Sequence, residues 1–127
     1  MKRSLLLGSL IATASTSAAQ TEVTPLVSQE LAGIAGKEGL MLLVEYAPSA
    51  ADPIHRHDAD VFVYVLEGSI VMQVEGGEPI TLQPGQTFRE GPGDIHTVGR
   101  NASDTEPAKF LAFFVKNTGA PPVIPVE

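Results

Sequence analysis

Three histidines are the residues of this chain best suited to metal chemistry, and the 127-residue sequence contains no others. His55 and His57 lie one residue apart in a stretch that is typical of a β-strand. Side chains at positions i and i+2 of a strand point to the same face, roughly 6.6 Å apart along the chain. The third, His96, follows a Pro92–Gly93 turn at the start of another expected strand. Imidazole nitrogens bind a divalent metal at about 2.0–2.1 Å, so three converging rings would form a metal site.

A less specific interpretation of the His55 and His57 pair stays open. Two histidines in this spacing are more often exposed, or hydrogen-bonded to neighbouring groups, than bound to a metal. The chain contains no cysteine, so any metal must be bound through nitrogen and oxygen. The metal interpretation therefore depends on whether His96 lies beside the other two rings.

The first 19 residues have the order of a secretory signal peptide. Lys2 and Arg3 are followed by an apolar run from Leu5 to Ala12, and then by the small residues Ser17-Ala18-Ala19. We expect cleavage near Ala19 and a secreted or periplasmic protein. The apolar run is shorter than the roughly 20 residues that cross a bilayer, and no cysteine could carry a lipid, so we expect no membrane anchor. A hydrophobic N-terminal helix is the alternative.

Composition limits the classes of partner. The chain has 15 acidic and 8 basic residues and a formal net charge of −7. Binding to nucleic acid needs clustered lysine and arginine, so nucleic acid is not an expected partner. The residues that remain after cleavage are enough for one domain with one core, which we place at residues 20–116. Residues 117–127 contain three prolines, and we expect an extended or disordered tail there.

Short apolar runs punctuated by glycine and proline predict an all-β sandwich or barrel. The sequence has 12 glycines and 10 prolines, and no long stretch repeats its apolar residues with a helical period. The expected strands are 41–46, 60–66, 69–74, 80–82, 87–89, 95–98 and 109–115.

Glu67-Gly68 is interpreted as a two-residue hairpin turn, with glycine supplying the positive φ. If Leu66 then pairs with Ser69, alternate residues of the two strands share one apolar, inward face. The inward set is Val61, Val63, Val65, Ile70, Met72 and Val74. Of these, we expect Val61, Val63 and Met72 to line a pocket.

The same register turns Phe62 and Tyr64 outward. Aromatic side chains on the outside of a barrel need cover, which would come from the segment 23–31 or from a second subunit. We therefore expect a homodimer.

Two motifs in this chain resemble those of the cupins. His55-Arg56-His57, followed by residues 61–68, resembles the first motif, within about 53–68. Gly85, Pro92-Gly93-Asp94-Ile95-His96 and Asn101 resemble the second, within about 85–101. The likeness runs from about Glu38 to Val115. It implies a small single-domain cupin: a double-stranded β-helix, or jelly-roll barrel, with a metal at its mouth and frequent dimerisation. It also implies that His55, His57 and His96 are the metal ligands.

One position departs from the cupin pattern. Val61 stands where the first motif usually has a glutamate, and alternation places Asp58 and Asp60 off the histidine face. Glu90 and Asp94 are expected to be loop carboxylates in water. We therefore expect three neutral imidazoles without a carboxylate ligand. Such a site keeps open positions, as catalytic sites do, and leaves the bound cation a strong Lewis acid.

The metal and the reaction stay open. Imidazole suits Zn, Cu, Fe and Ni, and the resemblance adds Mn. The first hypothesis is a metal-dependent enzyme acting on a small apolar molecule, either a dioxygenase-like oxidoreductase or a lyase or isomerase. No acid or base is evident in the sequence to support it. The alternatives are a non-catalytic module that binds a metal or small ligand, and a metal that only braces the barrel.

Overall fold

A computed structural model of the chain describes residues 20–127, so the predicted signal peptide at 1–19 lies outside the described residues. All ten elements within 20–127 are β-strands, which confirms the all-β prediction. In this part of the chain no helix has the length and apolar character needed to cross a membrane.

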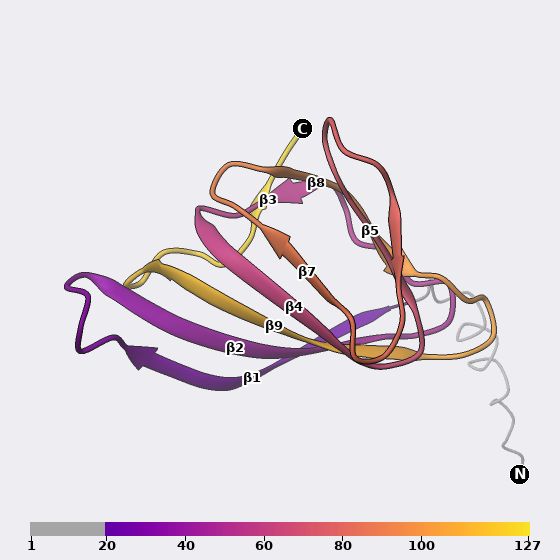
Figure 1. Cartoon of the computed structure of the whole chain (residues 1–127), viewed down its shortest axis with the longest axis horizontal. Coiled ribbons are helices and arrows are strands. Elements are labelled where there is room, and N and C mark those ends of the chain that lie inside the picture. The colour runs from indigo at the N-terminus through magenta and orange to yellow at the C-terminus, as the bar shows by residue number, and fades with distance from the viewer. Residues whose placement is uncertain (1–19) are drawn as a thin grey trace, which may run out of the picture.

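The strands form two five-stranded sheets, and all their pairings are antiparallel (Figure 1). The first sheet has the order β1 (Thr21–Glu30), β2 (Lys37–Tyr46), β9 (Ala108–Asn117), β4 (Ala59–Glu67) and β7 (Thr87–Glu90). The second has the order β10 (Ile124–Pro125), β3 (His55–Arg56), β8 (Ile95–Asn101), β5 (Ile70–Val74) and β6 (Ile80–Leu82).

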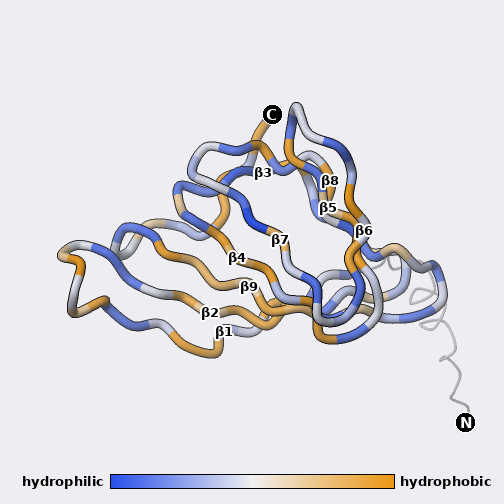
Figure 2. Tube along the Cα trace, in the orientation of Figure 1, coloured by the Kyte–Doolittle hydropathy of each residue, from blue (hydrophilic) through white to orange (hydrophobic). Residues whose placement is uncertain are grey.

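The core lies on the inner faces of these sheets. Buried and partly exposed residues alternate along β9, and β4 alternates in the same way over most of its length. This is the pattern of strands with one face turned to the interior. Figure 2 shows the corresponding apolar stretches along β2, β4 and β9. The inner side chains of these three strands are Leu40, Leu42, Val44, Tyr46, Ala59, Val61, Val63, Val65, Ala108, Phe110, Ala112 and Phe114.

The predicted hairpin at Glu67-Gly68 is wrong. β4 pairs with β7 and β9, whereas β5 pairs with β6 and β8, so the chain crosses from one sheet to the other at this point. Gly68 has a φ of 70°, and a Cβ there would lie 2.4 Å from the carbonyl oxygen of Pro107. Both the backbone conformation and the close approach therefore require glycine at the crossing.

The inward face predicted for β4 is nevertheless found, because it depends on alternation and not on the partner strand. Val61, Val63 and Val65 are buried, while Phe62 and Tyr64 are 45% and 46% exposed. On β5 the prediction is less accurate, since Val71, placed outward, is also buried.

The N-terminal segment does not cover the outward aromatics. Residues 23–30 belong to β1, which pairs with β2 at the edge of the first sheet and is separated from β4 by β2 and β9. The proposal that residues 23–31 shield Phe62 and Tyr64 is therefore wrong. Within residues 20–127 both rings stay nearly half exposed, and the Arg89 guanidinium lies over the Phe62 ring at 5.9 Å from its centroid.

Candidate metal centre

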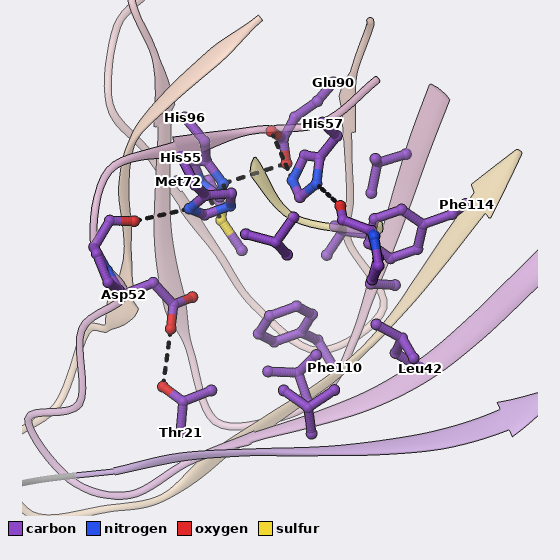
Figure 3. Close-up of a pocket in the computed structure, with 18 of the residues that line it drawn as sticks. Thr21, Leu42, Asp52, His55, His57, Met72, Glu90, His96, Phe110 and Phe114 are labelled. Atoms are coloured by element: carbon purple, nitrogen blue, oxygen red, sulfur yellow. Dashed lines mark hydrogen bonds and ion pairs between the residues drawn. The ribbon is translucent and has the colours of Figure 1, made fainter. Parts of the chain in front are cut away.

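The structure brings the three histidines together on the inner side of the second sheet (Figure 3). His55 on β3 pairs directly with His96 on β8, and His57 follows β3 by one residue. The three rings are 9%, 4% and 4% exposed, and each offers a nitrogen within 4.8 Å of the other two. His55 Nε2 and His96 Nδ1 are 3.2 Å apart. A single cation could therefore contact all three residues.

Two proline carbonyls orient two of the rings. His55 Nδ1 donates to the carbonyl oxygen of Pro53 at 2.8 Å, and His57 Nδ1 donates to that of Pro122 at 2.6 Å. In each ring the proton on Nδ1 leaves the lone pair of Nε2 free. Imidazoles that bind metals usually donate their other N–H in this way, which fixes the tautomer and the ring plane.

The third ring is seated between a sulfur atom and a glycine. His96 Nε2 lies 3.0 Å from Met72 Sδ, so that Nδ1 is the nitrogen turned toward His55. A Cβ on Gly99 would come within 3.0 Å of the His96 ring, and glycine leaves the space that this ring needs. Met72 faces the cavity, as the alternation along β5 indicates.

Glu90 also lies in the site, and the expectation of a loop carboxylate in water is wrong for this residue. Its side chain is 2% exposed. Its Oε1 is 3.5 Å from His57 Nε2, and its Oε2 is 3.4 Å from His96 Nδ1. Oε1 is buried without a hydrogen-bond partner. The prediction that no carboxylate points into the site is therefore wrong, because Glu90 does.

The position of Glu90 follows from strand pairing. Glu90 ends β7, where it pairs with Val61 on β4. Strand β7 thus places the Glu90 carboxylate beside Val61, the position at which the first cupin motif usually has its glutamate. The sequence offered one indication of this position. Phe88 and Glu90 are two residues apart on the same strand and therefore face the same side, and Phe88 packs against the core. Asp58 and Asp94 are exposed as expected, and Asp60 pairs with Arg89 on the outer face.

Burial determines the charges of this cluster. Desolvation raises the pKa of Glu90 to about 7, with a smaller contribution from Asp94. Desolvation also lowers the pKa of His96 to about 4, aided by the neighbouring His55 and His57. The pKa of His57 is lowered, mainly by burial. Burial therefore favours the neutral form of His57 and His96, which is the form that binds metals. The unpartnered Glu90 oxygen fits a nearby cation.

The histidines open onto a cavity of about 280 Å³. The predicted lining residues Val61, Val63 and Met72 all border it. Its other apolar walls include Leu42, Val44, Phe110, Phe114, Pro122 and Val123. The chamber is thus largely apolar, with polar groups gathered at the histidine end.

A second polar group on the wall has no counterpart in the sequence analysis. Asp52 accepts hydrogen bonds from the Tyr46 hydroxyl at 2.6 Å and from the Thr21 hydroxyl at 2.9 Å. Burial and the Asp52 charge raise the pKa of Tyr46 above its ordinary value. These bonds tie the start of β1 to the loop that precedes His55.

Comparison with known proteins gives a family and a set of similar folds. The Cupin domain family matches residues 42–114. None of the curated proteins matches the sequence. A DMSP lyase, DddQ, from Ruegeria pomeroyi DSS-3 is 23% identical with a TM-score of 0.60; the match covers 68% of this chain and 42% of that one.

Two further solved structures resemble the chain. An oxalate oxidase in complex with the substrate analogue glycolate is 22% identical with a TM-score of 0.66, covering 88% of this chain and 58% of that chain. A cupin domain from Bordetella pertussis Tohama I is 21% identical with a TM-score of 0.58, covering 76% and 93%. At these identities the similarity establishes the fold, and the chain spans only 42% and 58% of the two enzymes.

Replacing Glu90 by glutamine tests its burial. Because the folded-state pKa is raised from 4.5 to about 7, the ionised carboxylate destabilises the metal-free fold above pH 7, and this cost disappears as the pH falls toward 4.5. We expect Glu90→Gln to increase the free energy of unfolding by about 2–3 kcal/mol at pH 8 and by little at pH 4.5. Urea unfolding of chelated protein measures the difference.

The exposed Glu78 provides the control. Glu78→Gln should change stability by less than about 0.5 kcal/mol at either pH. If the Glu90 and Glu78 variants behaved alike, the carboxylate of Glu90 would not be buried in solution.

Proposed function

The chain belongs to the cupin domain family, whose model matches more than half of the sequence. We propose that it is an exported, metal-dependent enzyme acting on a small, mostly apolar molecule. The observation that carries the proposal is the grouping of three buried imidazoles and one buried carboxylate at the end of an apolar cavity. The cavity sets the size and character of the substrate.

His55, His57 and His96 would hold a divalent transition metal, which could be Mn, Fe, Zn, Cu or Ni. Three protein ligands leave further positions open to a substrate, and a bound cation acts there as a Lewis acid that polarises a carbonyl or carboxyl group. The neutral imidazoles would leave the charge of the cation unchanged, and the Glu90 carboxylate beside two of the rings would offset part of it.

Glu90 favours a lyase or isomerase over an oxygenase. Its Oε1 has no hydrogen-bond partner and lies 3.5 Å from His57 Nε2, so its free lone pairs face the histidine end of the cavity. A cation bound by the histidines would keep this carboxylate ionised, and an ionised carboxylate beside the open positions can act as a general base. In this proposal Glu90 takes a proton from the carbon next to the polarised group, while Val61 and Phe114 keep water away. The similarity of fold to a DMSP lyase is consistent with such chemistry.

The dioxygenase-like interpretation remains the second candidate. It needs no proton-accepting side chain from the protein, and an oxalate oxidase shares the fold. It makes no use of Glu90, whose burial without a partner costs stability. The third interpretation, a non-catalytic binding module, leaves Glu90 without a function as well.

We also propose a homodimer formed by the outer face of the first sheet. Phe62 and Tyr64 are nearly half exposed there, and they pair across the sheet with Phe113 and Leu111. A second copy would bury these side chains and remove an apolar patch from water. Equilibrium sedimentation should give twice the chain mass for the mature protein and a shift toward the monomer for Tyr64→Glu. A monomeric mature protein would contradict the proposal.

Elemental analysis of exported protein tests the metal site. We expect about one transition-metal ion per mature chain, and a decrease of tenfold or more in His57→Ala, because one of three ligands is lost. Arg56→Ala is the matched control, since this neighbouring side chain pairs with Asp58 on the surface. Equal metal content in both variants would rule out the site. The mass of the same protein should place its N-terminus near Gln20.

Hydrogen exchange tests the reaction class without knowledge of the true substrate. We expect the metal-loaded protein to exchange C–H hydrogens next to the carbonyl group of some small ketones or carboxylic acids in D₂O, as followed by NMR. Glu90→Gln should lower the exchange rate at least a hundredfold and keep its metal, because a general base contributes about 10²–10⁴-fold.

The controls separate the three interpretations. Glu78→Gln should exchange at the rate of the unmodified protein. Oxygen consumption that is unaffected by Glu90→Gln would favour the dioxygenase instead. Bound metal with no turnover of any kind would favour the binding module.

A further inference from the structure

The end of the chain is part of the candidate site. The strap, defined here as residues 119–127, runs from the end of β9 to the edge of the second sheet, where its strand β10 pairs with β3. Figure 1 shows this yellow segment passing β3. Pro125 lies opposite His55 and Ile124 opposite Arg56. Three strap residues, Pro122, Val123 and Pro125, border the cavity. The segment expected to be an extended or disordered tail is therefore extended and in contact with the histidine motif.

The strap is held at both ends by specific contacts. Near its start, the buried Lys116 side chain donates to the carbonyl oxygen of Ala120 at 2.6 Å and also pairs with Glu38. Near its end, the Val126 amide donates to the carbonyl oxygen of Ile54 at 3.3 Å. Three prolines in nine residues also restrict the strap when it is free, which lowers the entropic cost of docking it.

Between these anchors the strap contacts a ring of the metal centre. The carbonyl oxygen of Pro122 accepts the Nδ1 proton of His57 at 2.6 Å, across 65 residues of sequence (Figure 3). We infer that the strap is a positioning element, which holds His57 in the tautomer whose Nε2 can bind a metal and forms one wall of the substrate cavity. The metal part of this inference rests on the proposed function; the tautomer part does not.

The two halves of the His-x-His pair differ in what holds them. His55 donates to Pro53, only two residues away, so its orientation is a local property of the loop. His57 depends on a residue at the far end of the chain. Without that acceptor, the free imidazole can place its proton on Nε2 and block the nitrogen that faces Glu90. Loss of the strap removes the Pro122 acceptor of His57, whereas His55 keeps its Pro53 acceptor although β10 no longer pairs with β3. The Nδ1–H tautomer of His55 should therefore persist, which gives the experiment an internal control.

Histidine-selective ¹⁵N NMR of the metal-free protein tests this inference directly, because the chain has only three histidines. In a chain ending at Thr118, we expect the ring nitrogens of His57 to lose the pattern of a fixed Nδ1–H tautomer, while those of His55 keep it. A chain ending at Val126 retains Pro122 and both anchors of the strap, and it should give the spectrum of the full protein. Unchanged His57 signals in the chain ending at Thr118 would overturn the inference.

Zinc affinity, measured by competition with a chromophoric chelator, gives the second readout. We expect the chain ending at Thr118 to bind Zn²⁺ at least tenfold more weakly than the chain ending at Val126, the usual effect of losing a hydrogen bond to a metal ligand. Equal zinc affinities of the two chains would also contradict the inference that the strap positions His57. If neither chain bound zinc, the proposed function would fail, while the NMR result would still decide the tautomer.

A second variant guards against loss of folding in the truncated chain. Inserting two glycines between Gly119 and Ala120 keeps every strap residue but moves Pro122 out of register with His57. The His57 signals should change in the same direction as in the truncated chain. If they remained those of the full protein, the Pro122 carbonyl would not be what fixes the ring.

Discussion

The burial of a polar cluster in an apolar barrel is the constraint on which the rest of the structure depends. Three imidazoles and a carboxylate are almost removed from water, and one carboxylate oxygen has no partner. Desolvation disfavours every charged form in such a place, so the pKa values of His57 and His96 are lowered and that of Glu90 is raised. A divalent cation would resolve this, because neutral imidazoles bind it directly and a nearby negative charge becomes favourable beside it.

Each group in the cluster reaches the same point by a different route. His55 and His96 face one another as direct partners of β3 and β8, whereas Glu90 arrives from the first sheet through its pairing beside β4. Two main-chain carbonyls, at Pro53 and Pro122, set the rings of the first motif. The site is therefore a product of both sheets, and the apolar side chains between them define the cavity.

The parts that could be predicted are those that local alternation determines. The spacing of His55 and His57 places them on one side of the chain, and the inward face of β4 was found even though its partner strand was misassigned. The resemblance to the cupins indicated His96 as the third metal ligand. These features need no knowledge of which strands pair.

The features that the sequence did not predict all depend on contacts between segments that lie far apart in the chain. Glu90 enters the site because β7 lies beside β4, and no local pattern fixes that neighbour. The Glu67-Gly68 segment has the composition of a hairpin, but the close approach of Pro107 makes it a crossing between sheets. The strap looked like a loose tail because its prolines exclude helix, and its docking depends on Lys116 and on the edge of β3.

Anomalous diffraction from crystals of the zinc-loaded mature protein would test the central claim most directly. We expect one strong peak per chain, about 2.0–2.1 Å from Nε2 of His55, Nε2 of His57 and one nitrogen of His96. The peak should lie at the end of the cavity beside Glu90. Zinc bound only at acidic residues of the surface, with no density among the three rings, would contradict it.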